Sequence, residues 1–295
     1  MKKRIFTGCA TALVTPFNAD CSVNYPRLRQ LINEQINGGV DALVICGTTG
    51  ESATLDNDEH CRVLEEAVKT ADGRVPIIAG TGSNDTMYAV QLSQHAEAIG
   101  CDGLLMVTPY YNKTSQNGLI NHYFYVADRV KTPIILYNVP SRTGTAIKPE
   151  TYKELSKHEN IVAVKEANGD ISSIAKTKSL CGDDLDIYSG NDDEIVPILS
   201  LGGIGIISVL SNILPKETHN ICEEEFMGNH KKACEMQLKY ISLINALFSD
   251  VNPIPVKEAM NMMGLNMGPL RMPLAPMTDS AREALRAELK KHGLL

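Results

Sequence analysis

The sequence predicts an α/β protein, a (β/α)8 TIM barrel followed by a C-terminal helical appendage. Eight short apolar runs recur along the 295 residues, and stretches long enough for crossover helices separate them. The runs are continuous in Ile, Val, Leu and Ala instead of alternating with polar residues, which is typical of parallel strands covered on both faces. No Gly-x-Gly-x-x-Gly motif follows the first run, so a closed barrel is favoured over an open doubly wound sheet.

The apolar runs give the expected strands directly. These are residues 7–17, 41–47, 76–82, 103–109, 133–139, 161–167, 185–191 and 205–212. Amphipathic segments lie between them and are expected to form crossover helices at residues 25–37, 58–70, 86–99 and 118–130. Asp56, followed three residues later by Glu59, is typical of a capping box at the start of a helix.

The chain after the eighth run contains more helix than one crossover needs. Helical segments are expected at residues 216–226, 230–248, 255–263 and 278–292. We therefore expect two parts, a catalytic barrel at residues 1–228 and a helical appendage at residues 229–295. No linker-like composition separates the two parts, so we expect the appendage to pack on the barrel.

Composition and charge exclude several classes of protein. With 43% hydrophobic and 21% charged residues, the chain has the composition of an ordinary globular protein. The formal net charge is −7 and no Lys- or Arg-rich block is available to neutralise phosphates, so no nucleic-acid partner is expected. No apolar stretch approaches the roughly 20 residues needed to cross a bilayer, so no membrane span is expected either.

The N-terminus and the cysteines favour a cytoplasmic location. Basic residues 2–4 precede the Gly8-Cys9 pair without an apolar region between them, which favours a short tail before the first strand over an export signal. The 8 cysteines include no Cys-x-x-Cys pair, so metal-ligand spacing is absent. We expect reduced thiols that pack as small hydrophobic side chains, and no metal site.

Lys165 is the first candidate for chemistry, because active sites of such barrels lie at the carboxyl ends of the strands. It comes late in the apolar run 161–167, and burying an ammonium group without a partner favours the neutral, nucleophilic amine. Two structural alternatives remain open at this point. The side chain can reach solvent along its apolar stem, or it can pair with Glu166.

Tyr137 and the turn at residues 47–52 are candidates for the same site. Tyr137 lies at the same depth as Lys165, and neighbouring strands are roughly 4.8 Å apart, so its phenol is expected within reach of the amine. A packed tyrosine with one hydrogen bond is the structural alternative. The turn reads Gly-Thr-Thr-Gly-Glu-Ser and offers amides and hydroxyls suited to a carboxylate. It is not a Walker loop, since no Gly-Lys-Ser/Thr follows.

Five segments together resemble the dihydrodipicolinate synthase family, within the superfamily of pyruvate-dependent class I aldolases and N-acetylneuraminate lyase. They occur in order over essentially the whole chain, at residues 47–52, 107–112, 137–144, 164–167 and 252–257. The resemblance implies a lyase that condenses pyruvate with L-aspartate 4-semialdehyde to give 4-hydroxy-tetrahydrodipicolinate, in the diaminopimelate route to lysine. It also implies a reaction without a metal or an organic cofactor.

The resemblance further implies a nucleophile and a proton relay. Lys165 would form an imine with the ketone of pyruvate, and cyclisation of the product would release it. The enamine formed from this imine would attack the aldehyde of the semialdehyde. Protons would pass through Tyr137, Thr49 and Tyr111, with Tyr111 donated across a subunit interface.

Substrate-binding roles follow from the same resemblance. Thr48 and Thr49 would hold the carboxylate of pyruvate, and the carbonyl of Ile207 would help orient the site. Arg142 would bind the carboxylate of the semialdehyde at the mouth of the cleft, a task suited to a planar bidentate donor. The resemblance also implies a homotetramer made of two tight dimers.

The family's feedback site for lysine lies in the cleft between tightly paired subunits. In this chain it corresponds to Ser52, Ala53, Asn57, His60, Asn84, Tyr88 and Tyr110. Inhibited relatives typically carry a glutamate at the position of Tyr88 and often a histidine at that of Asn57. Because a phenol here replaces the carboxylate partner of the ligand's ammonium, we expect lysine to inhibit weakly or not at all.

Two other functions remain open. A 2-keto-3-deoxy sugar-acid aldolase would share the pyruvate imine, but such aldolases are not expected to carry Arg142. A catalytically silent metabolite-binding barrel is not expected to keep Thr49, Tyr111, Tyr137 and Lys165 together.

Two further signals receive structural interpretations. The acidic residues 192–194 are expected to complement the dipole of the helix that they open, instead of binding a metal. The methionines between residues 260 and 277 are expected to fill packing or interface space.

Overall fold

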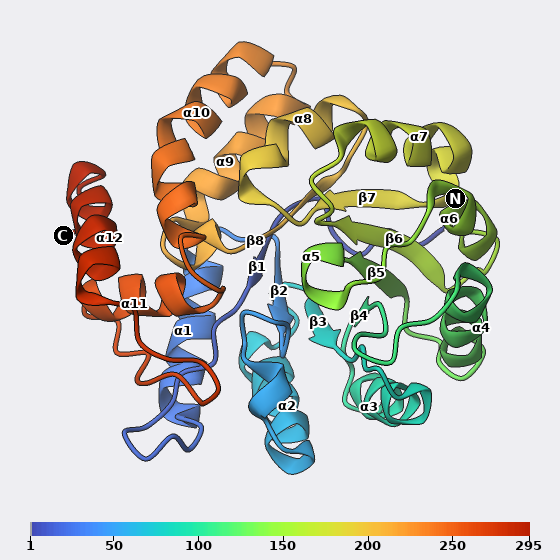
Figure 1. Cartoon of the computed structure of the whole chain (residues 1–295), viewed down its shortest axis with the longest axis horizontal. Coiled ribbons are helices and arrows are strands. Elements are labelled where there is room, and N and C mark those ends of the chain that lie inside the picture. The colour runs from blue at the N-terminus through green and yellow to red at the C-terminus, as the bar shows by residue number, and fades with distance from the viewer. Residues whose placement is uncertain (1) are drawn as a thin grey trace.

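A computed structural model, which describes residues 2–295, forms a closed barrel of parallel strands (Figure 1). Each strand pairs with the next along the chain, and β8 pairs with β1 to close the barrel. The strands are β1 (Gly8–Ala12), β2 (Ala42–Ile45), β3 (Ile77–Gly80), β4 (Gly103–Val107), β5 (Ile134–Asn138), β6 (Ile161–Glu166), β7 (Asp186–Ser189) and β8 (Gly205–Ser208). The predicted barrel is therefore confirmed, and each expected run contains one strand.

Several strands end before their apolar runs do, because the chain leaves the sheet to build the loops at the carboxyl end. After β1, the amide of Val14 donates to the side chain of Asn212. The amide of Phe17 donates to the carbonyl of Met267 in the C-terminal part of the chain. Val14 and Phe17 are buried in the main hydrophobic core, which explains why the apolar run continues past the strand.

Helices follow the strands and surround the barrel (Figure 1). The longer ones are α1 (Tyr25–Asn37), α2 (Asn57–Ala71), α3 (Thr86–Ala98), α4 (Gln116–Ala127), α6 (Pro149–Leu155), α7 (Ile171–Cys181), α8 (Ile195–Ser200), α9 (Pro215–Phe226), α10 (His230–Leu247), α11 (Ile254–Met262) and α12 (Asp279–Lys291). The short ones are α5 (Pro140–Thr143) and the 3-10 turns η1 (Ser52–Thr54), η2 (Gly182–Asp184), η3 (Asp192–Glu194) and η4 (Leu210–Asn212). The four expected crossover helices correspond to α1–α4.

Local signals set the helix ends. The capping box predicted at Asp56 and Glu59 is present at the start of α2, with each side chain bonded to the other residue's amide. Helix α4 begins slightly before the expected segment, because the Ser115 side chain accepts a hydrogen bond from the amide of Gly118 and caps it there.

The interior of the barrel is filled by its own small core, which includes Ala10, Val44 and Ile135. Near the amino ends of the strands, Phe6 stacks on Tyr188 with ring centroids 4.3 Å apart. The Tyr188 hydroxyl also donates to the carbonyl of Phe6 at 2.7 Å. Because aromatic rings fill this end, a polar site is accommodated at the opposite end, where the strands finish.

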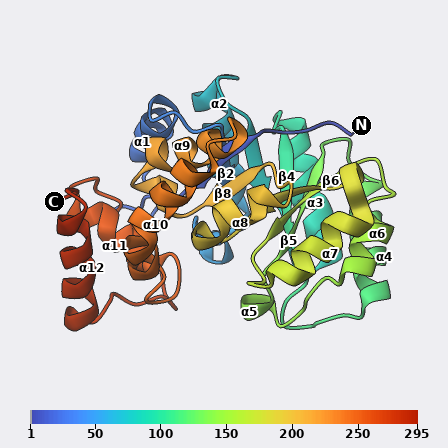
Figure 2. The ribbon, with the colours of Figure 1, turned by 90° about the horizontal axis from the view of Figure 1, so that it is seen from above.

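Helices α10, α11 and α12 lie on one side of the barrel, near α1 and α9 (Figures 1 and 2). The chain turns between α9 and α10 at Gly228, whose φ of 81° is in the region that favours glycine. The division into a barrel at residues 1–228 and an appendage at residues 229–295 stays a prediction. Within residues 2–295, the structure contains no helix with the length and apolar character needed to cross a membrane.

Candidate active site

A cavity of about 160 Å³ opens at the carboxyl ends of the strands. The residues that line it include Thr48, Thr49, Tyr137, Arg142 and Lys165. These five come from the turn after β2, from β5 and the short helix behind it, and from β6. The barrel thus brings together most of the residues that the sequence proposed for catalysis and substrate binding.

Lys165 and Tyr137 are direct neighbours in the sheet. They pair in the register of β5 with β6, and the Lys165 Nζ lies 4.4 Å from the centre of the Tyr137 ring. Lys165 is 6% exposed and Tyr137 is 7% exposed, so the alternative of a lysine that reaches solvent is wrong. Among the described residues, no carboxylate lies within ion-pair distance of the Lys165 Nζ.

Glu166 does not pair with Lys165, because successive residues of a strand point to opposite faces of the sheet. Its buried carboxyl group instead contacts the Tyr152 hydroxyl and accepts a hydrogen bond from the Asn138 side chain at 3.0 Å. The Asn138 oxygen in turn accepts from the amide of Ile147 at 3.1 Å. This cluster joins β5 to β6 behind the site and fixes the register that places Tyr137 beside Lys165.

We predict that Glu166 makes stability fall as the pH rises. Burial raises the pKa of Glu166 to about 7, although hydrogen bonds from Tyr152 and Asn138 oppose the shift. The native protein then binds this proton more tightly than the unfolded chain does. The contribution of the protonated Glu166 to the free energy of unfolding is therefore largest at low pH, and it is lost as the pH rises through the pKa of the folded state. The expected loss between pH 5.5 and pH 8 is about 2 kcal/mol.

Glu166→Gln removes this titration, so the variant should lose less stability than the wild type over that range. Urea unfolding at the two pH values measures the difference. Glu159→Gln is the matched control, because Glu159 is exposed and lies in the same part of the chain. An unchanged pH dependence in Glu166→Gln would show that the Glu166 proton is not linked to folding.

The turn at residues 47–52 presents both threonines to the cavity. Its backbone is tightly folded, with the Gly50 amide bonded to the Gly47 carbonyl and the Glu51 amide bonded to the Thr48 carbonyl, each at 3.1 Å. The Thr49 side chain is buried, and its Oγ1 accepts a hydrogen bond from the Asn252 Nδ2 at 3.0 Å. The next strand packs closely against the turn, since a Cβ at Gly80 would lie 2.1 Å from the Cys46 carbonyl oxygen.

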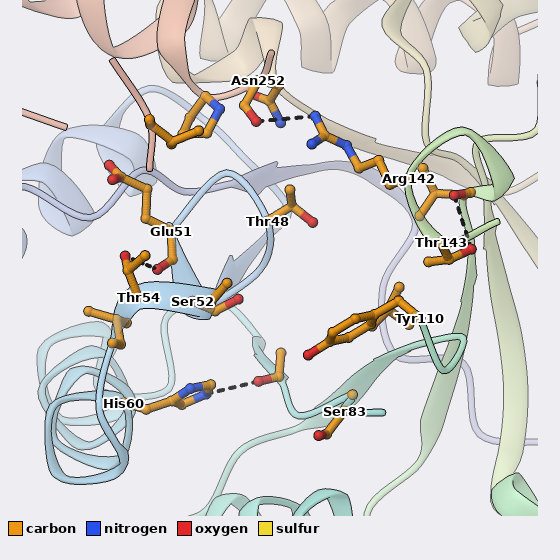
Figure 3. Close-up of a pocket in the computed structure, with 18 of the residues that line it drawn as sticks. Thr48, Glu51, Ser52, Thr54, His60, Ser83, Tyr110, Arg142, Thr143 and Asn252 are labelled. Carbon is orange, nitrogen blue, oxygen red and sulfur yellow. Dashed lines mark hydrogen bonds between the residues drawn. The ribbon is translucent and has the colours of Figure 1, made fainter. Parts of the chain in front are cut away.

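Arg142 lies at the mouth of the cavity. It belongs to α5, which directly follows β5, and its side chain is exposed. The guanidinium donates one hydrogen bond, from Nη2 to the carbonyl of Asn252 at 3.1 Å, as the dashed line in Figure 3 marks. Its remaining donors are available to a ligand that enters from outside.

Two predicted residues are placed differently from the other five. Tyr111 is 92% exposed and does not line the cavity of its own chain. It also has a φ of 68°, in a region that residues other than glycine rarely adopt. Ile207 is fully buried in β8, opposite Ala10, whereas Val209 lines the cavity instead. The role of the Ile207 carbonyl stays a prediction.

Asn252 is a site residue whose role was not predicted from the sequence. Its amide group donates to Thr49, its backbone carbonyl accepts from Arg142, and it borders the cavity. Its Oδ1 is buried and has no hydrogen-bond partner among residues 2–295. The Asn-Pro-Ile-Pro segment contributes to the family resemblance. Its place in the fold, however, depends on contacts with Thr49 and Arg142, which are distant in the sequence.

The acidic residues 192–194 form η3, which leads directly into α8, but the Asp192 carboxylate has its hydrogen-bond partners outside this helix. This carboxylate is buried and accepts hydrogen bonds from the Ser208 hydroxyl at 2.5 Å and from the amides of Val209 and Leu210 at 3.0 Å each. Burial raises the pKa of Asp192, while these hydrogen bonds oppose the shift. Asp192 therefore fastens the loop after β7 to the turn after β8, next to the cavity.

A second cavity, of about 430 Å³, adjoins the first (Figure 3). Thr48, Val139, Arg142 and Asn252 line both cavities. Of the residues proposed for lysine binding, this cavity is lined by Ser52, Ala53, His60, Tyr88 and Tyr110. Figure 3 shows the Tyr110 side chain entering the cavity from the side opposite the segment that carries Ser52 and His60.

The other two residues of the proposed lysine set do not line the second cavity. Asn84 lies next to it, because its side chain donates to the Tyr110 carbonyl at 3.2 Å. Asn57 is exposed at the start of α2. Burial lowers the pKa of His60, whose Nε2 lies 2.9 Å from the Gly80 carbonyl oxygen.

Comparisons with known proteins agree with this geometry. Residues 5–292 match the model of the Dihydrodipicolinate synthetase family. The 4-hydroxy-tetrahydrodipicolinate synthase of Caldicellulosiruptor saccharolyticus is 55% identical over 290 residues, which cover 98% of this chain and 98% of that protein.

Solved structures are equally similar in fold. The chloride-inhibited dihydrodipicolinate synthase of Acinetobacter baumannii, solved in complex with pyruvate, superposes with a TM-score of 0.96 at 40% identity and covers 98% of this chain and 99% of its own. The enzyme of Cyanidioschyzon merolae, solved with lysine bound, gives a TM-score of 0.96 at 38% identity, with coverage of 99% and 100%. Because the similarity spans the barrel and every loop that builds the cavity, the chain belongs to the dihydrodipicolinate synthetase family.

Proposed function

We propose that this chain catalyses the reaction of a 4-hydroxy-tetrahydrodipicolinate synthase. It condenses pyruvate with L-aspartate 4-semialdehyde, through a Schiff base on Lys165, to give 4-hydroxy-tetrahydrodipicolinate in the diaminopimelate route to lysine. The observation that carries the proposal is the position of Lys165, a buried amine beside Tyr137 in a cavity that two threonine side chains also line. A buried, unpaired amine is suited to attack a carbonyl carbon.

The first half of the reaction forms the imine. The Lys165 amine attacks the ketone carbon of pyruvate, and the carbonyl oxygen leaves as water once it has been protonated. Tyr137, which pairs with Lys165 in the register of the sheet, and Thr49 both line this cavity and supply the proton. The hydroxyls and amides of Thr48 and Thr49 hold the pyruvate carboxylate, so that the ketone faces the amine. Loss of a methyl proton then gives the enamine.

The second half joins the two substrates. The enamine carbon attacks the aldehyde carbon of the semialdehyde, whose oxygen takes up a proton. The amino group of the semialdehyde then attacks the imine carbon, closes the ring and displaces the Lys165 amine. Arg142 at the mouth binds the carboxylate of the semialdehyde and holds its aldehyde over the enamine.

Acceptor choice tests the proposed function against its rivals. The purified protein is given pyruvate with either aspartate semialdehyde or glyceraldehyde, and the loss of both substrates is followed by NMR. We expect turnover with the semialdehyde and little with glyceraldehyde. Preference for glyceraldehyde would indicate a sugar-acid aldolase, whereas binding of pyruvate without an imine would indicate a silent metabolite-binding barrel.

Arg142→Ala is predicted to impair use of aspartate semialdehyde far more than imine formation with pyruvate. The loss in kcat/KM for the semialdehyde should be about ten- to hundredfold, which corresponds to a charge-assisted contact of roughly 1.5 to 3 kcal/mol. Steady-state kinetics measure the first effect and borohydride trapping the second. Arg142→Lys is the matched variant, because it keeps the charge and loses the bidentate fork. Equal loss of both steps would assign Arg142 a structural role.

Assembly, location and cofactor use are part of the same proposal. A homotetramer of two tight dimers would cover the exposed Tyr111 and bring it to a neighbouring site. All cysteines of the chain are unpaired thiols, which supports a cytoplasmic location. The imine chemistry that we propose uses only side chains and substrates, and it needs neither a metal nor an organic cofactor.

Lysine is predicted to inhibit this protein weakly or not at all. The second cavity, of about 430 Å³, has the volume of a small-molecule site, but Tyr88 offers a phenol to the ligand's ammonium in place of a carboxylate. Glu51 also borders the cavity, yet its carboxylate is already paired with Lys257 at 2.7 Å. An ammonium group that enters this cavity therefore loses its hydration without gaining a charged partner.

A lysine titration at subsaturating pyruvate measures this prediction. Tyr88→Glu restores a carboxylate at the cavity wall and should make the protein more sensitive to lysine, while Tyr88→Gln serves as the uncharged control. Strong inhibition of the wild type at sub-millimolar lysine would mean that another residue supplies the missing charge.

A further inference from the structure

The appendage reaches into the barrel through a fully buried ion pair. Lys257, on α11, places its Nζ 2.7 Å from the Glu51 Oε1, and both side chains are only 1% exposed. The same Nζ lies 3.9 Å from the centre of the Phe17 ring. A buried pair of this kind is a weak source of stability, whereas removal of one partner leaves the other charge buried without compensation. The function of this ion pair is therefore inferred from which segments it joins, and not from its contribution to the stability of the fold.

The second oxygen of Glu51 is also engaged by the C-terminal segment. Glu51 Oε2 accepts a hydrogen bond from the amide of Arg271 at 2.9 Å. The guanidinium of the same residue, Arg271, donates two hydrogen bonds of 2.6 Å to the Glu59 carboxylate and one of 2.7 Å to the Thr54 carbonyl. Three points of the segment from Glu51 to Glu59 are thus held by residues of the appendage.

Glu51 is directly coupled to the threonines of the candidate site. It lies two residues after Thr49, and its amide donates to the Thr48 carbonyl at 3.1 Å. Its φ of 55° is left-handed, a conformation that a residue with a long side chain adopts only when its surroundings impose it. The anchored carboxylate is the evident constraint, since both of its oxygens are bonded to the appendage.

We propose that Lys257 and Glu51 are positioning residues for the pyruvate carboxylate. By fixing the left-handed residue at the end of the turn, the pair sets the direction in which Thr48 and Thr49 face the cavity. The inference rests on the proposed function, in which these threonines hold that carboxylate. It assigns the appendage a task in substrate binding, although neither charged group of the pair lines the cavity that contains Lys165.

The test compares Lys257→Met with Arg27→Met. Lys257→Met keeps the length of the side chain and removes the charge that anchors Glu51. Arg27 is a suitable control because it is also a buried cation joined to the C-terminal segment, through a 2.7 Å bond to the Leu265 carbonyl, and it lies outside the site. Steady-state kinetics for each substrate, the rate of borohydride trapping at varied pyruvate, and the melting temperature are measured for both.

In Lys257→Met we expect the KM for pyruvate, and the pyruvate concentration for half-maximal trapping, to rise about tenfold or more. The KM for aspartate semialdehyde should change by less than about threefold. Arg27→Met should lower the melting temperature and leave the KM for pyruvate unchanged. Should Lys257→Met fail to fold, Glu51→Gln is the second variant, because its amide keeps only one acceptor for the two bonds and weakens the same anchor.

Three results would overturn the inference. They are an unchanged KM for pyruvate in folded Lys257→Met or Glu51→Gln, an equal rise for both substrates, and an equal rise in Arg27→Met. Lys257→Arg should recover most of the affinity for pyruvate, since it restores the charge. Failure of the proposed function itself would look different, because the wild type would then form no borohydride adduct with pyruvate.

Discussion

Lys165→Ala is expected to abolish the pyruvate imine and to lower kcat by at least about 10³-fold, because no other group can replace the amine that bonds to the substrate. In the structure this amine is buried, lies beside Tyr137 and has no carboxylate partner within residues 2–295. Intact-mass measurement after treatment with pyruvate and borohydride should show one adduct per wild-type chain and none in the variant. Peptide mapping should locate that adduct at Lys165.

Lys113→Ala is the control for this experiment. Lys113 is an exposed lysine whose side chain lies against Gly144, at the end of the short helix α5 that carries Arg142. It does not line the cavity that contains Lys165. The variant should keep both the adduct and the activity. An adduct at Lys257 or another lysine, or full activity in Lys165→Ala, would end the assignment.

The positions of Lys165 and Tyr137 were predictable because they depend on local patterns. Each comes late in a continuous apolar run, and neighbouring parallel strands of a closed barrel begin at similar depths. The sheet register confirms that the two residues are paired. The turn after β2 was predictable for the same reason, since Gly47 and Gly50 mark it in the sequence and the barrel fixes the end at which it lies.

The contacts that fix the site from behind were not predictable from such patterns. Glu51 and Lys257 are 206 residues apart, and nothing near either residue indicates its partner. Asp192 has the position of a helix-opening acid, but its partners lie at the end of β8 and directly after it, and only closure of the barrel brings them together. The role of Asn252 is hidden in the same way, because the segment after α10 must fold back before its amide can reach Thr49.

Tyr111 marks a different limit, because its environment depends on more than one chain. Family resemblance assigns it to the proton relay, yet in the single chain it is 92% exposed and does not line the cavity that contains Lys165. An aromatic side chain exposed to this extent, on a backbone held at a φ of 68°, is suited to a pocket on another subunit. The interpretation therefore requires that two chains share each site.

Mixing two inactive variants tests whether two chains share each site. The mixture should regain much of the enzymatic activity that each variant lacks alone. Tyr111→Phe lacks the relay hydroxyl and Lys165→Ala lacks the nucleophile, so each protein alone should be inactive. In a hybrid dimer, however, one of the two sites receives Lys165 from one chain and Tyr111 from the other. With random exchange of equal amounts, half of the dimers are hybrids, so activity should recover to about one quarter of the wild-type value.

The decisive control replaces Tyr111→Phe by Tyr137→Phe in the same mixture. Tyr137 and Lys165 are paired within one barrel, so no hybrid of Tyr137→Phe with Lys165→Ala contains a complete site, and no recovery is expected. Subunit exchange is verified in both mixtures by native mass spectrometry with one isotope-labelled partner. Recovery in both mixtures would indicate residual activity of the variants, whereas no recovery in either, despite proven exchange, would show that Tyr111 serves the site of its own chain.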